Sequence, residues 1–324
     1  MQRIGVLTSG GDAPGMNAAL RAVTREALAR RAEVVGIRHG FAGIVRQEFI
    51  ELSRSRVGGI LERGGTILQT ARYEEFKRPE RQRQARAILR DQGLIGLIVI
   101  GGDGSFRAAQ RLHLLGLPTI GIPATIDNDI PGTDMAIGVD TALNTVIRAI
   151  DRIRDTATSH SRAFVVEVMG RRSGYLALAA GLAAGAEIIL VPEVPLDLRW
   201  VVSRIKRGEE LGKQHSIIVV AEGVCPEGSA GYQIAREIAQ QIDYEIRVTV
   251  LGHVQRGGSP SVFDRLLAVR LGAAAVDRLL DGSSGQMVAL QGNAIITKKF
   301  SECLRRRKRI DRELLKLAHR LAAD

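Results

Sequence analysis

Short runs of aliphatic and β-branched residues alternate along the chain with longer segments in which apolar residues recur at helical spacing. We expect the apolar runs to be buried β-strands, over Ile4–Leu7, Val34–Ile37, Ile95–Ile100, Thr119–Ile122, Phe164–Val168, Ile188–Val191, Ile217–Val220 and Val248–Leu251. The expected helices cover Ala18–Arg30, Phe106–Leu115, Thr141–Asp155, Tyr175–Ala184 and Val262–Leu280. Strands that alternate with helices predict an α/β protein built on wound sheets.

Six motifs follow directly after predicted strands. They read TSGGD, GGDGS, ATIDND, MGRRSG, AEGV and LGHVQRGGS. In open α/β sheets, ligands bind at the carboxyl ends of the strands. The positions of these motifs therefore predict that they line ligand sites.

Length and composition limit the class of protein. A chain of 324 residues with 45% hydrophobic residues can bury a sizeable core, and we expect two domains. No apolar run approaches membrane-spanning length, and no export signal precedes the first strand, so we expect a cytoplasmic protein without a membrane partner. Cys225 and Cys303 have neither the number nor the spacing for a disulfide framework or a metal site.

The net charge of +11 raises the question of nucleic-acid binding. The basic residues are mostly arginines dispersed between apolar segments, which favours small anionic ligands. The one dense basic run, Leu304–Arg309, lacks interleaved aromatic residues, and we interpret it as a solvated helix face. We therefore expect no nucleic-acid partner.

Two glycine-rich loops have the chemistry of phosphate sites. In LTSGGDAPG (7–15) and VIGGDGS (99–105), a Gly-Gly pair follows a strand and precedes a helix, so backbone amides can approach a phosphate. A Gly-Gly pair is also common in plain tight turns. In the second loop we expect Ser105 to cap the next helix. With no lysine nearby, Asp103 is interpreted as a Mg²⁺ ligand.

The TIDND segment places Asp127 and Asp129 two residues apart. In an extended segment both carboxylates would point the same way, so that one tunes the other and one accepts a proton. The alternative is an Asx-rich turn before Pro131. Thr125 adds a hydroxyl donor suited to a phosphoryl oxygen. Together with the glycine loops, this segment predicts phosphoryl transfer.

The order and length of the motifs reveal a resemblance over nearly the whole chain. LTSGGDAPGMNAA, RGGT, IGGDGS, TIDNDI, GTD, EVMGR, VPE and TVLGHVQRGGSP stand in the order found in bacterial ATP-dependent 6-phosphofructokinases. The resemblance implies transfer of the ATP γ-phosphate to the 1-hydroxyl of fructose 6-phosphate in glycolysis, with Mg²⁺, by a homotetramer. It also implies the phosphofructokinase fold, with two similar Rossmann-like domains. These are an ATP-binding domain (1–138 and 251–301) and a fructose 6-phosphate-binding domain (139–250 and 302–324).

The family pattern assigns roles residue by residue. The catalytic residues are Asp127 as base, with Thr125 and Arg171 holding the transferred phosphoryl group. The ATP-binding residues are Gly11, Arg72, Tyr73, Gly102, Asp103, Gly104 and Ser105, and Asp103 serves the metal. The sugar-phosphate residues are Thr125, Asp127, Asp129, Arg162, Met169, Gly170, Arg171, Glu222, Arg247, His253 and Arg256. In the family, Arg162 and Arg247 come from a neighbouring subunit. By themselves, His253 could be an ordinary loop histidine and Glu222 a strand-end cap.

An effector site for ADP and phosphoenolpyruvate is also implied. It matches Arg21, Arg25, Arg54, Arg154, Gly185, Glu187, Leu211, Lys213 and His215. Arg21 and Arg25 share a helix face at i, i+4 spacing, although a solvated charged face has the same spacing. Leu211 replaces a basic residue of the well-studied members, so one charged contact to an effector is missing.

The nearest alternative is a pyrophosphate-dependent phosphofructokinase. Gly104 argues against it, because those relatives tend to carry aspartate there, where it would repel the α-phosphate region of ATP. Ala124 replaces the glycine usual in ATP-dependent members, and we expect its methyl group to lie near the nucleotide; pyrophosphate enzymes tend to carry lysine. Lipid and NAD kinases share the GGDG loop but not LGHVQRGGS. A silent nucleotide sensor or a nucleic-acid binder would not need Asp127.

Overall fold

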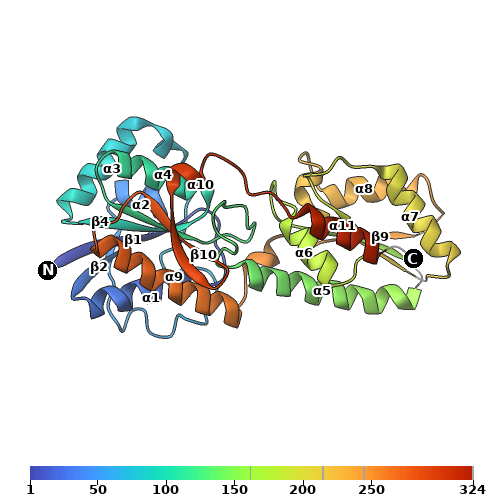
Figure 1. Ribbon diagram of the computed structural model, residues 1–324, viewed down its shortest axis with the longest axis horizontal. Helices are drawn as coiled ribbons and strands as arrows, with labels where there is room; N and C mark the ends of the chain where they lie inside the picture. Colours follow the sequence, from blue (N-terminus) through green and yellow to red (C-terminus); the bar gives the residue numbers. More distant parts are fainter. Residues whose placement is uncertain (161, 214, 244, 323–324) are drawn as a thin grey trace. The chain divides into compact units, whose positions relative to one another are not determined.

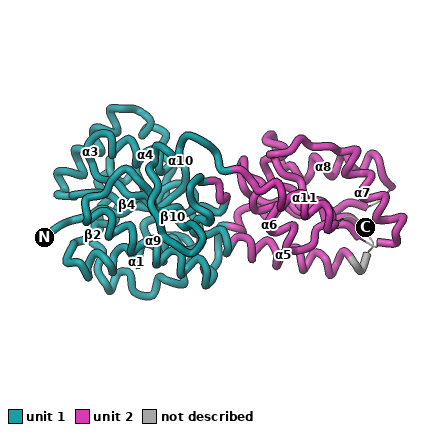
Figure 2. The backbone as a smooth tube through the Cα atoms, viewed as in Figure 1, with its two compact units in different colours: residues 1–126, 130–141, 256–308 teal, residues 127–129, 142–255, 309–324 magenta. Residues whose placement is uncertain are grey.

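The structure is a computed structural model that describes residues 1–160, 162–213, 215–243 and 245–322. It divides into two compact units, which Figure 2 shows in different colours. Unit 1 comprises residues 1–126, 130–141 and 256–308, and unit 2 comprises residues 127–129, 142–255 and 309–324. The chain passes from one unit to the other mainly at 141/142, 255/256 and 308/309, whereas the predicted domain boundaries are at 138/139, 250/251 and 301/302. Residues 323–324 of the predicted second domain lie outside the described residues.

Unit 1 contains a seven-stranded sheet with the order β11-β10-β5-β4-β1-β2-β3. Its strands are β1 (Gln2–Ser9), β2 (Ala32–Ile37), β3 (Phe49–Glu51), β4 (Gly96–Gly101), β5 (Thr119–Pro123), β10 (Gln286–Gln291) and β11 (Ala294–Lys299). The five central strands are parallel, and β3 and β11 pair antiparallel at the two edges. The central strands are buried on both faces, which explains their continuous apolar runs.

Helices cover both faces of this sheet (Figure 1). They are α1 (Met16–Ala29), α2 (Gly40–Val45), α3 (Pro79–Asp91), α4 (Asp103–Leu114), α9 (Val262–Leu280) and α10 (Phe300–Cys303), with a 3₁₀ turn η1 (Glu74–Lys77). Helices α1 and α9 pack together on one face. The other face carries α2, α3, α4 and α10 around a core that includes Leu7, Leu97, Phe106 and Phe300. The ring centroids of Phe106 and Phe300 lie 5.4 Å apart, so α10 is packed directly on α4.

Unit 2 contains a four-stranded, all-parallel sheet with the order β7-β8-β6-β9. Its strands are β6 (Ala163–Val168), β7 (Ile188–Leu190), β8 (Ser216–Ala221) and β9 (Ile246–Val250). Its helices are α5 (Val139–His160), which starts in unit 1, α6 (Tyr175–Ala183), α7 (Leu198–Glu210), α8 (Ala230–Ala239) and α11 (Arg312–Leu321), with 3₁₀ turns η2 (Glu222–Val224) and η3 (Gly252–Arg256). Helices α7 and α8 share a core with Val165 and Ile218, whereas α6 packs closely on Ile189 and Val219.

A buried carboxylate holds the start of α5, where the chain leaves unit 1. Asp264, near the start of α9, is fully buried and accepts hydrogen bonds from the backbone N–H of Gly138 at 2.9 Å and of Thr141 at 2.8 Å. The Thr141 hydroxyl donates a third at 2.5 Å. Burial raises the pKa of Asp264, while these hydrogen bonds act in the opposite direction. Asp264 therefore satisfies amides at the N-terminus of α5 that no helical carbonyl can reach.

The predicted strands and helices are all present, and the α/β fold class is confirmed. The prediction missed β3 and the β10–β11 hairpin, although the two-residue turn Gly292-Asn293 between apolar runs is a typical hairpin signal. The helical interpretation of Leu304–Arg309 is wrong, because this run lies between α10 and α11. Lys308 explains its course: its ammonium donates to the carbonyls of Thr133 and Asp134 at 2.8 and 2.7 Å. None of the helices described is both long and apolar enough to cross a bilayer.

Candidate active site

In unit 1, three motif-bearing strands lie side by side. Strand β4 pairs with β1 on one side and β5 on the other, and the register aligns Gly101 with Ser9 and with Pro123. The loops that follow these strands carry TSGGD, GGDGS and ATIDND. Because the strands are parallel and end in register, the sheet brings these loops to one edge, as predicted.

The first glycine loop is closed by an arginine. Gly10 has a φ of +89°, and the guanidinium of Arg256 donates to the carbonyl of Asp12 at 3.0 Å. A Cβ atom at Gly11 would lie 2.3 Å from Nη1 of Arg256, so only glycine allows this close approach. The structure thus places Arg256, predicted for the sugar phosphate, against the loop predicted for ATP.

The second glycine loop opens directly into a helix. Helix α4 begins at Asp103, and Gly102 is its N-cap, without a side-chain hydrogen bond. The prediction that Ser105 caps this helix is wrong, since Ser105 is the third helical residue and is buried. The first amides of α4 consequently lack a side-chain cap, which suits the N-terminus to an anion.

Asp103 lies in the first turn of α4 and is paired. Nε of Arg107, one turn later, lies 3.1 Å from Oδ2 of Asp103. The prediction of a Mg²⁺ ligand rested on the absence of a nearby lysine and did not consider this arginine. Among the described residues, no cluster of three or more His, Cys, Asp or Glu side chains could hold a metal ion. Mg²⁺ often binds through one or two carboxylates together with substrate phosphates and waters. Asp103, with a side chain 41% exposed, fits that mode.

The two positions from which the sequence analysis predicts the phosphoryl donor, Gly104 and Ala124, differ in their surroundings. A Cβ atom at Gly104 would meet nothing within 4 Å, so packing does not require glycine there. Ala124 is only 1% exposed, and its backbone N–H donates to Gly101 at 3.0 Å. Its methyl group is therefore packed inside the protein, and the expectation that it lies near the nucleotide stays a prediction. Arg72 is exposed and Tyr73 half-buried just before η1.

The TIDND segment is not extended. Ile126 and Asp127 form a turn, and Asn128 has a φ of +47°, so the premise that both carboxylates point the same way is wrong. The turn begins where the backbone N–H of Thr125 donates to Ile137 at 3.1 Å. Asp127 is 3% exposed, and Asp129 is half-buried. A turn that buries one carboxylate and leaves the next partly accessible gives the two aspartates different surroundings.

In unit 2, strands β8, β6 and β9 are neighbours and parallel, so AEGV, MGRRSG and LGHVQRGGS also share an edge. The carboxylate of Glu222 accepts from the backbone N–H of Gly170 at 3.2 Å and of Arg171 at 2.6 Å. Arg171 has a φ of +54°, and its side chain is exposed. Glu222 thus stabilises an unusual turn that presents Arg171 to solvent. Its hydrogen bonds to backbone N–H groups at the end of β6 agree with the interpretation of Glu222 as a strand-end cap.

Gln255 was missed by sequence reasoning. It is fully buried; its Oε1 accepts from the backbone N–H of Met169 at 3.2 Å, and its Nε2 donates to the carbonyl of Gly252 at 2.9 Å. It therefore joins the end of β6 to η3, the 3₁₀ turn that carries His253, whose side chain is exposed. The signal available in the sequence was a glutamine within a motif otherwise rich in glycine.

Two further predicted phosphate ligands share one carboxylate. Arg162 precedes β6 and Arg247 lies on β9, and both form ion pairs with Glu245. The parallel pairing aligns Phe164 with Arg247, which brings the start of β6 beside the start of β9. This pair lies at the opposite strand ends from Arg171 and Glu222, so within unit 2 the predicted sugar-phosphate residues form two groups.

The predicted effector residues are only partly brought together. In unit 2, Arg154 donates to the carbonyls of Ala184 and Gly185, and Glu187 accepts from the backbone N–H of Ile217 at 2.8 Å. Lys213 and His215 follow α7, and Leu211 is its exposed C-cap. In unit 1, Arg21 and Arg25 are half-buried on α1, and Arg54 lines a shallow groove with Arg3 and Glu51.

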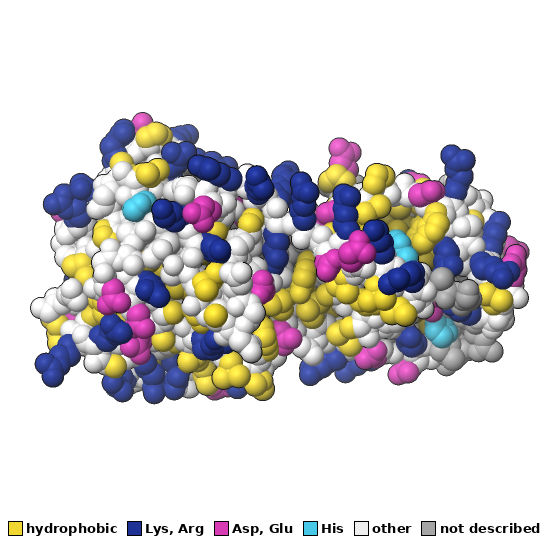
Figure 3. Space-filling view, in the orientation of Figure 1, with side chains coloured by type: hydrophobic (Ala, Val, Ile, Leu, Met, Phe, Trp, Pro, Cys, Tyr) yellow, Lys and Arg dark blue, Asp and Glu magenta, His cyan; other side chains and the backbone are white. Residues whose placement is uncertain are grey.

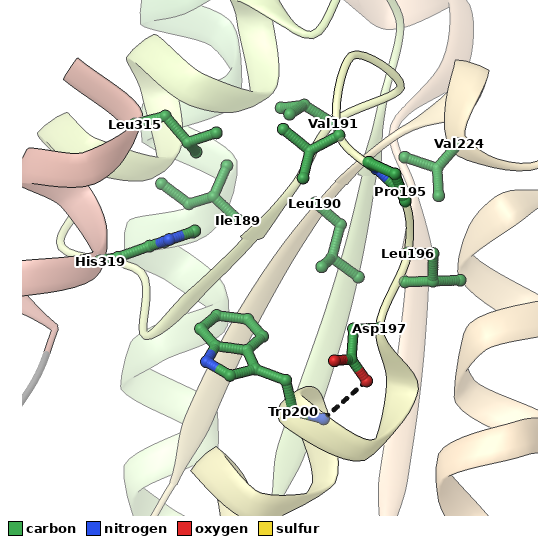
Figure 4. A pocket seen from close by; sticks show the side chains of 11 residues that line it. Ile189, Leu190, Val191, Pro195, Leu196, Asp197, Trp200, Val224, Leu315 and His319 are labelled. Atoms are coloured by element: carbon green, nitrogen blue, oxygen red, sulfur yellow. Dashed lines mark hydrogen bonds between the residues drawn. The ribbon is translucent and has the colours of Figure 1, made fainter. Parts of the chain in front are cut away.

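An apolar cavity in unit 2 contains none of the predicted site residues (Figure 4). It has a volume of about 240 Å³ and is lined mainly by aliphatic side chains of β7, the following loop and α11. Trp200 and His319 also line it, with ring centroids 5.0 Å apart. Burial lowers the pKa of His319. Asp197 caps α7 by accepting from Trp200 at 3.1 Å, so its carboxylate is already engaged.

Basic side chains on the face shown in Figure 3 are spread over both units and interspersed with acidic and hydrophobic ones. Among the described residues on this face, no continuous basic stripe is present that could bind a long polyanion. A small anionic ligand is the kind that such a surface suits.

Comparisons with known proteins show which family this chain is similar to. A profile of the family described as Phosphofructokinase matches residues 3–279. The ATP-dependent 6-phosphofructokinase of Halalkalibacterium halodurans is 56% identical over 322 residues, covering 99% of this chain and 100% of that protein. The enzyme of the same description from Bacillus mycoides is 55% identical over the same coverage.

Solved structures show the same fold. Phosphofructokinase from Saccharomyces cerevisiae has a TM-score of 0.87 and 34% identity; the match covers 99% of this chain and 47% of the yeast chain, so this chain spans less than half of that one. A pyrophosphate-dependent phosphofructokinase from Marinobacter aquaeolei has a TM-score of 0.86 at 22% identity, covering 97% and 86% of the two chains. At that identity the similarity shows the fold alone.

Proposed function

The chain belongs to the phosphofructokinase family, and from this premise we propose that it is an ATP-dependent 6-phosphofructokinase of cytoplasmic glycolysis. It transfers the γ-phosphate of ATP to the 1-hydroxyl of fructose 6-phosphate, which yields fructose 1,6-bisphosphate and ADP. The observation that carries the proposal is that each sheet gathers three of the six motifs at the carboxyl ends of adjacent strands. The loops after β1 and β4 are suited to a nucleotide, and the loops of unit 2 are suited to a sugar phosphate. The loop after β5 carries Thr125 and Asp127, which act on both substrates.

The nucleotide set uses backbone amides. The uncapped first turn of α4 and the bare loop at Gly104 allow ATP phosphates to approach the helix N-terminus. Gly11, Arg72 and Tyr73 complete the set. When bound at Asp103, Mg²⁺ neutralises charge on the phosphates. To bind it, Asp103 exchanges its exposed ion pair with Arg107, which costs little because such pairs contribute little to stability.

The sugar set uses charged side chains. Asp127 accepts the proton of the 1-hydroxyl as the oxygen attacks the γ-phosphorus, and Thr125 and Arg171 hold the phosphoryl oxygens. The turn stabilised by Glu222 fixes the backbone of Arg171, so less freedom is lost when the guanidinium binds. Asp129, Met169 and Gly170 contact the sugar. His253 and Arg256 hold its 6-phosphate together with Arg162 and Arg247 of a neighbouring subunit, since these two arginines lie at the opposite strand ends of unit 2.

The donor is tested by initial rates of fructose 6-phosphate phosphorylation with Mg²⁺ and either ATP or pyrophosphate. We expect ATP to support the reaction, and EDTA to abolish it. A faster rate with pyrophosphate would overturn the donor assignment but retain the fold. Gly104→Asp sharpens the test: the open space at this position accommodates the side chain, so a loss of ATP use would reflect repulsion of phosphate rather than misfolding.

Regulation and assembly are finer parts of the proposal. We expect a homotetramer with inhibition by phosphoenolpyruvate and activation by ADP. Arg154 supports this expectation, because its guanidinium is anchored at the Gly185 turn, where it could reach an effector phosphate. Sedimentation equilibrium measures the assembly, and Arg154→Ala should abolish inhibition by phosphoenolpyruvate. Inhibition that persists in this variant would remove the assigned site.

A further inference from the structure

The carboxylate of Glu245 forms ion pairs with both Arg162 and Arg247, the two arginines that we assign to the sugar 6-phosphate. Glu245 Oε2 lies 2.5 Å from Nε of Arg162, and Oε1 of the same carboxylate pairs with Nη2 of Arg247. Each oxygen therefore serves one guanidinium. Sequence reasoning identified both arginines but not the residue between them.

The backbone keeps Glu245 at this position. Its carbonyl accepts from the backbone N–H of Ala163 at 3.1 Å, directly after Arg162, and β6 and β9 continue from there as a parallel pair. Arg247 follows two residues after Glu245, so all three side chains lie at one end of two paired strands. Their proximity thus results from strand pairing and does not depend on the long side chains finding each other.

The carboxylate and the phosphate are both anions whose oxygens accept hydrogen bonds from guanidinium groups. Both groups offer several oxygens to guanidinium forks, but a phosphate monoester carries close to two negative charges at neutral pH and the carboxylate only one. The side chains of Arg162, Glu245 and Arg247 are 29%, 45% and 54% exposed. Ion pairs as exposed as these are weak, so an arriving dianion can displace the carboxylate.

We propose that Glu245 is a built-in competitor for the 6-phosphate of the sugar, and that it sets the affinity for this substrate. The inference rests on the proposed function. Without substrate, Glu245 offsets part of the positive charge of the two arginines and holds them near each other. When the phosphate binds, Glu245 must turn away, because it would otherwise repel the new anion. Monoanionic ligands gain too little to displace it, so Glu245 also favours dianionic phosphates.

The test is Glu245→Gln, which removes the charge but retains the size and one oxygen acceptor. We expect KM for fructose 6-phosphate to fall about threefold to tenfold, the scale of one exposed ion-pair network, with kcat and KM for ATP unchanged. Glu245→Asp keeps the charge and should stay close to the unchanged protein. Glu313→Gln is the matched control, since Glu313 forms an exposed pair with Lys316 in the same unit, with 2.8 Å between Oε1 and Nζ.

A binding measurement on the full chain separates this proposal from the assigned reaction. In calorimetric titrations without ATP, Glu245→Gln should bind inorganic phosphate and fructose 6-phosphate more tightly by the same factor as KM falls. Equal or weaker binding in Glu245→Gln would overturn the competitor role. Tighter phosphate binding by a protein that phosphorylates no sugar would keep the role of Glu245 and reject the proposed function.

Discussion

The two units place opposite chemistries at the same position of their sheets. At the carboxyl ends of β1 and β4, unit 1 offers glycine loops and the uncapped N-terminus of α4. At the carboxyl ends of β6 and β8, unit 2 offers an exposed arginine on a turn that a glutamate stabilises. Backbone amides suit a polyphosphate that lies along a loop, whereas side chains select one sugar phosphate. The comparison shows that one strand-end geometry can present either backbone or side-chain donors, and in the proposed function these serve two substrates.

Substitution of Asp127, the proposed base, should give the largest effect. Asp127→Asn removes the proton acceptor but keeps the buried turn, so kcat should fall by about 10²–10⁴-fold, the range for loss of general-base catalysis. Calorimetric affinities for ATP and fructose 6-phosphate should remain close to those of the unchanged protein. Near-normal turnover would remove Asp127 from the mechanism.

Two substitutions, compared by their effects on KM for ATP and for fructose 6-phosphate, test the proposal that the two units bind different substrates. Gly104→Asp should raise KM for ATP, because its carboxylate repels phosphate at the start of α4. Arg247→Gln should raise KM for fructose 6-phosphate by about 10–100-fold, since a charge-assisted hydrogen bond contributes about 1.5–3 kcal/mol. Each variant should leave KM for the other substrate within about twofold, well below one tenfold step of 1.4 kcal/mol. A variant that shifts both constants equally would contradict separate sites.

Asp264, in unit 1, tests whether a loss of stability in that unit also destabilises unit 2. In the native protein, both carboxylate oxygens of Asp264 accept hydrogen bonds from backbone N–H groups, those of Gly138 and Thr141. Asp264→Asn replaces one of these oxygens with an amide nitrogen, which cannot accept, so the free energy of unfolding should fall by about 1–3 kcal/mol. Asp277→Asn on the same helix, which breaks only a partly exposed pair with Arg30, should cost less than about 1 kcal/mol. Urea unfolding followed by circular dichroism measures the loss. Trp200, the only tryptophan and a residue of unit 2, reports whether that unit unfolds at the same urea concentration.

The smallest expected effect is a loss of stability of unit 2 at acidic pH, through His319. Because burial lowers the pKa of His319 in the folded chain, the unfolded chain takes up the proton first as the pH falls. Stability should therefore decrease as the pH drops below about 6.5 and level off once the folded imidazole is protonated too. Urea midpoints from Trp200 fluorescence at pH 7.5 and 5.5 measure this loss. His319→Gln should show a smaller difference between the two values, and an equal difference would assign the acid sensitivity to other groups.

Much of the arrangement of the motif loops could be predicted, because each motif is local in the chain and follows a strand. Glycine loops after apolar runs located Gly11 and Gly102–Ser105, and the parallel pairing confirmed that the loops share an edge. Local expectations failed where a neighbouring residue changed the geometry. Asn128 adopts a left-handed conformation, so TIDND turns, and Arg107 reaches back to Asp103. Both partners were visible in the sequence, but their conformations were not.

The sequence by itself determined the alternation of strands and helices, the strand-end positions of the motifs and the family, because these depend on short-range periodicity and on residues within single loops. Only the tertiary structure revealed Asp264 beneath Gly138, Gln255 beside Met169, and Glu245 between Arg162 and Arg247. Asp264 and Gly138 lie 126 residues apart in the chain, and Gln255 and Met169 lie 86 apart. Such partners meet through strand pairing and helix packing, and no local pattern encodes which distant side chain fills a given hydrogen bond.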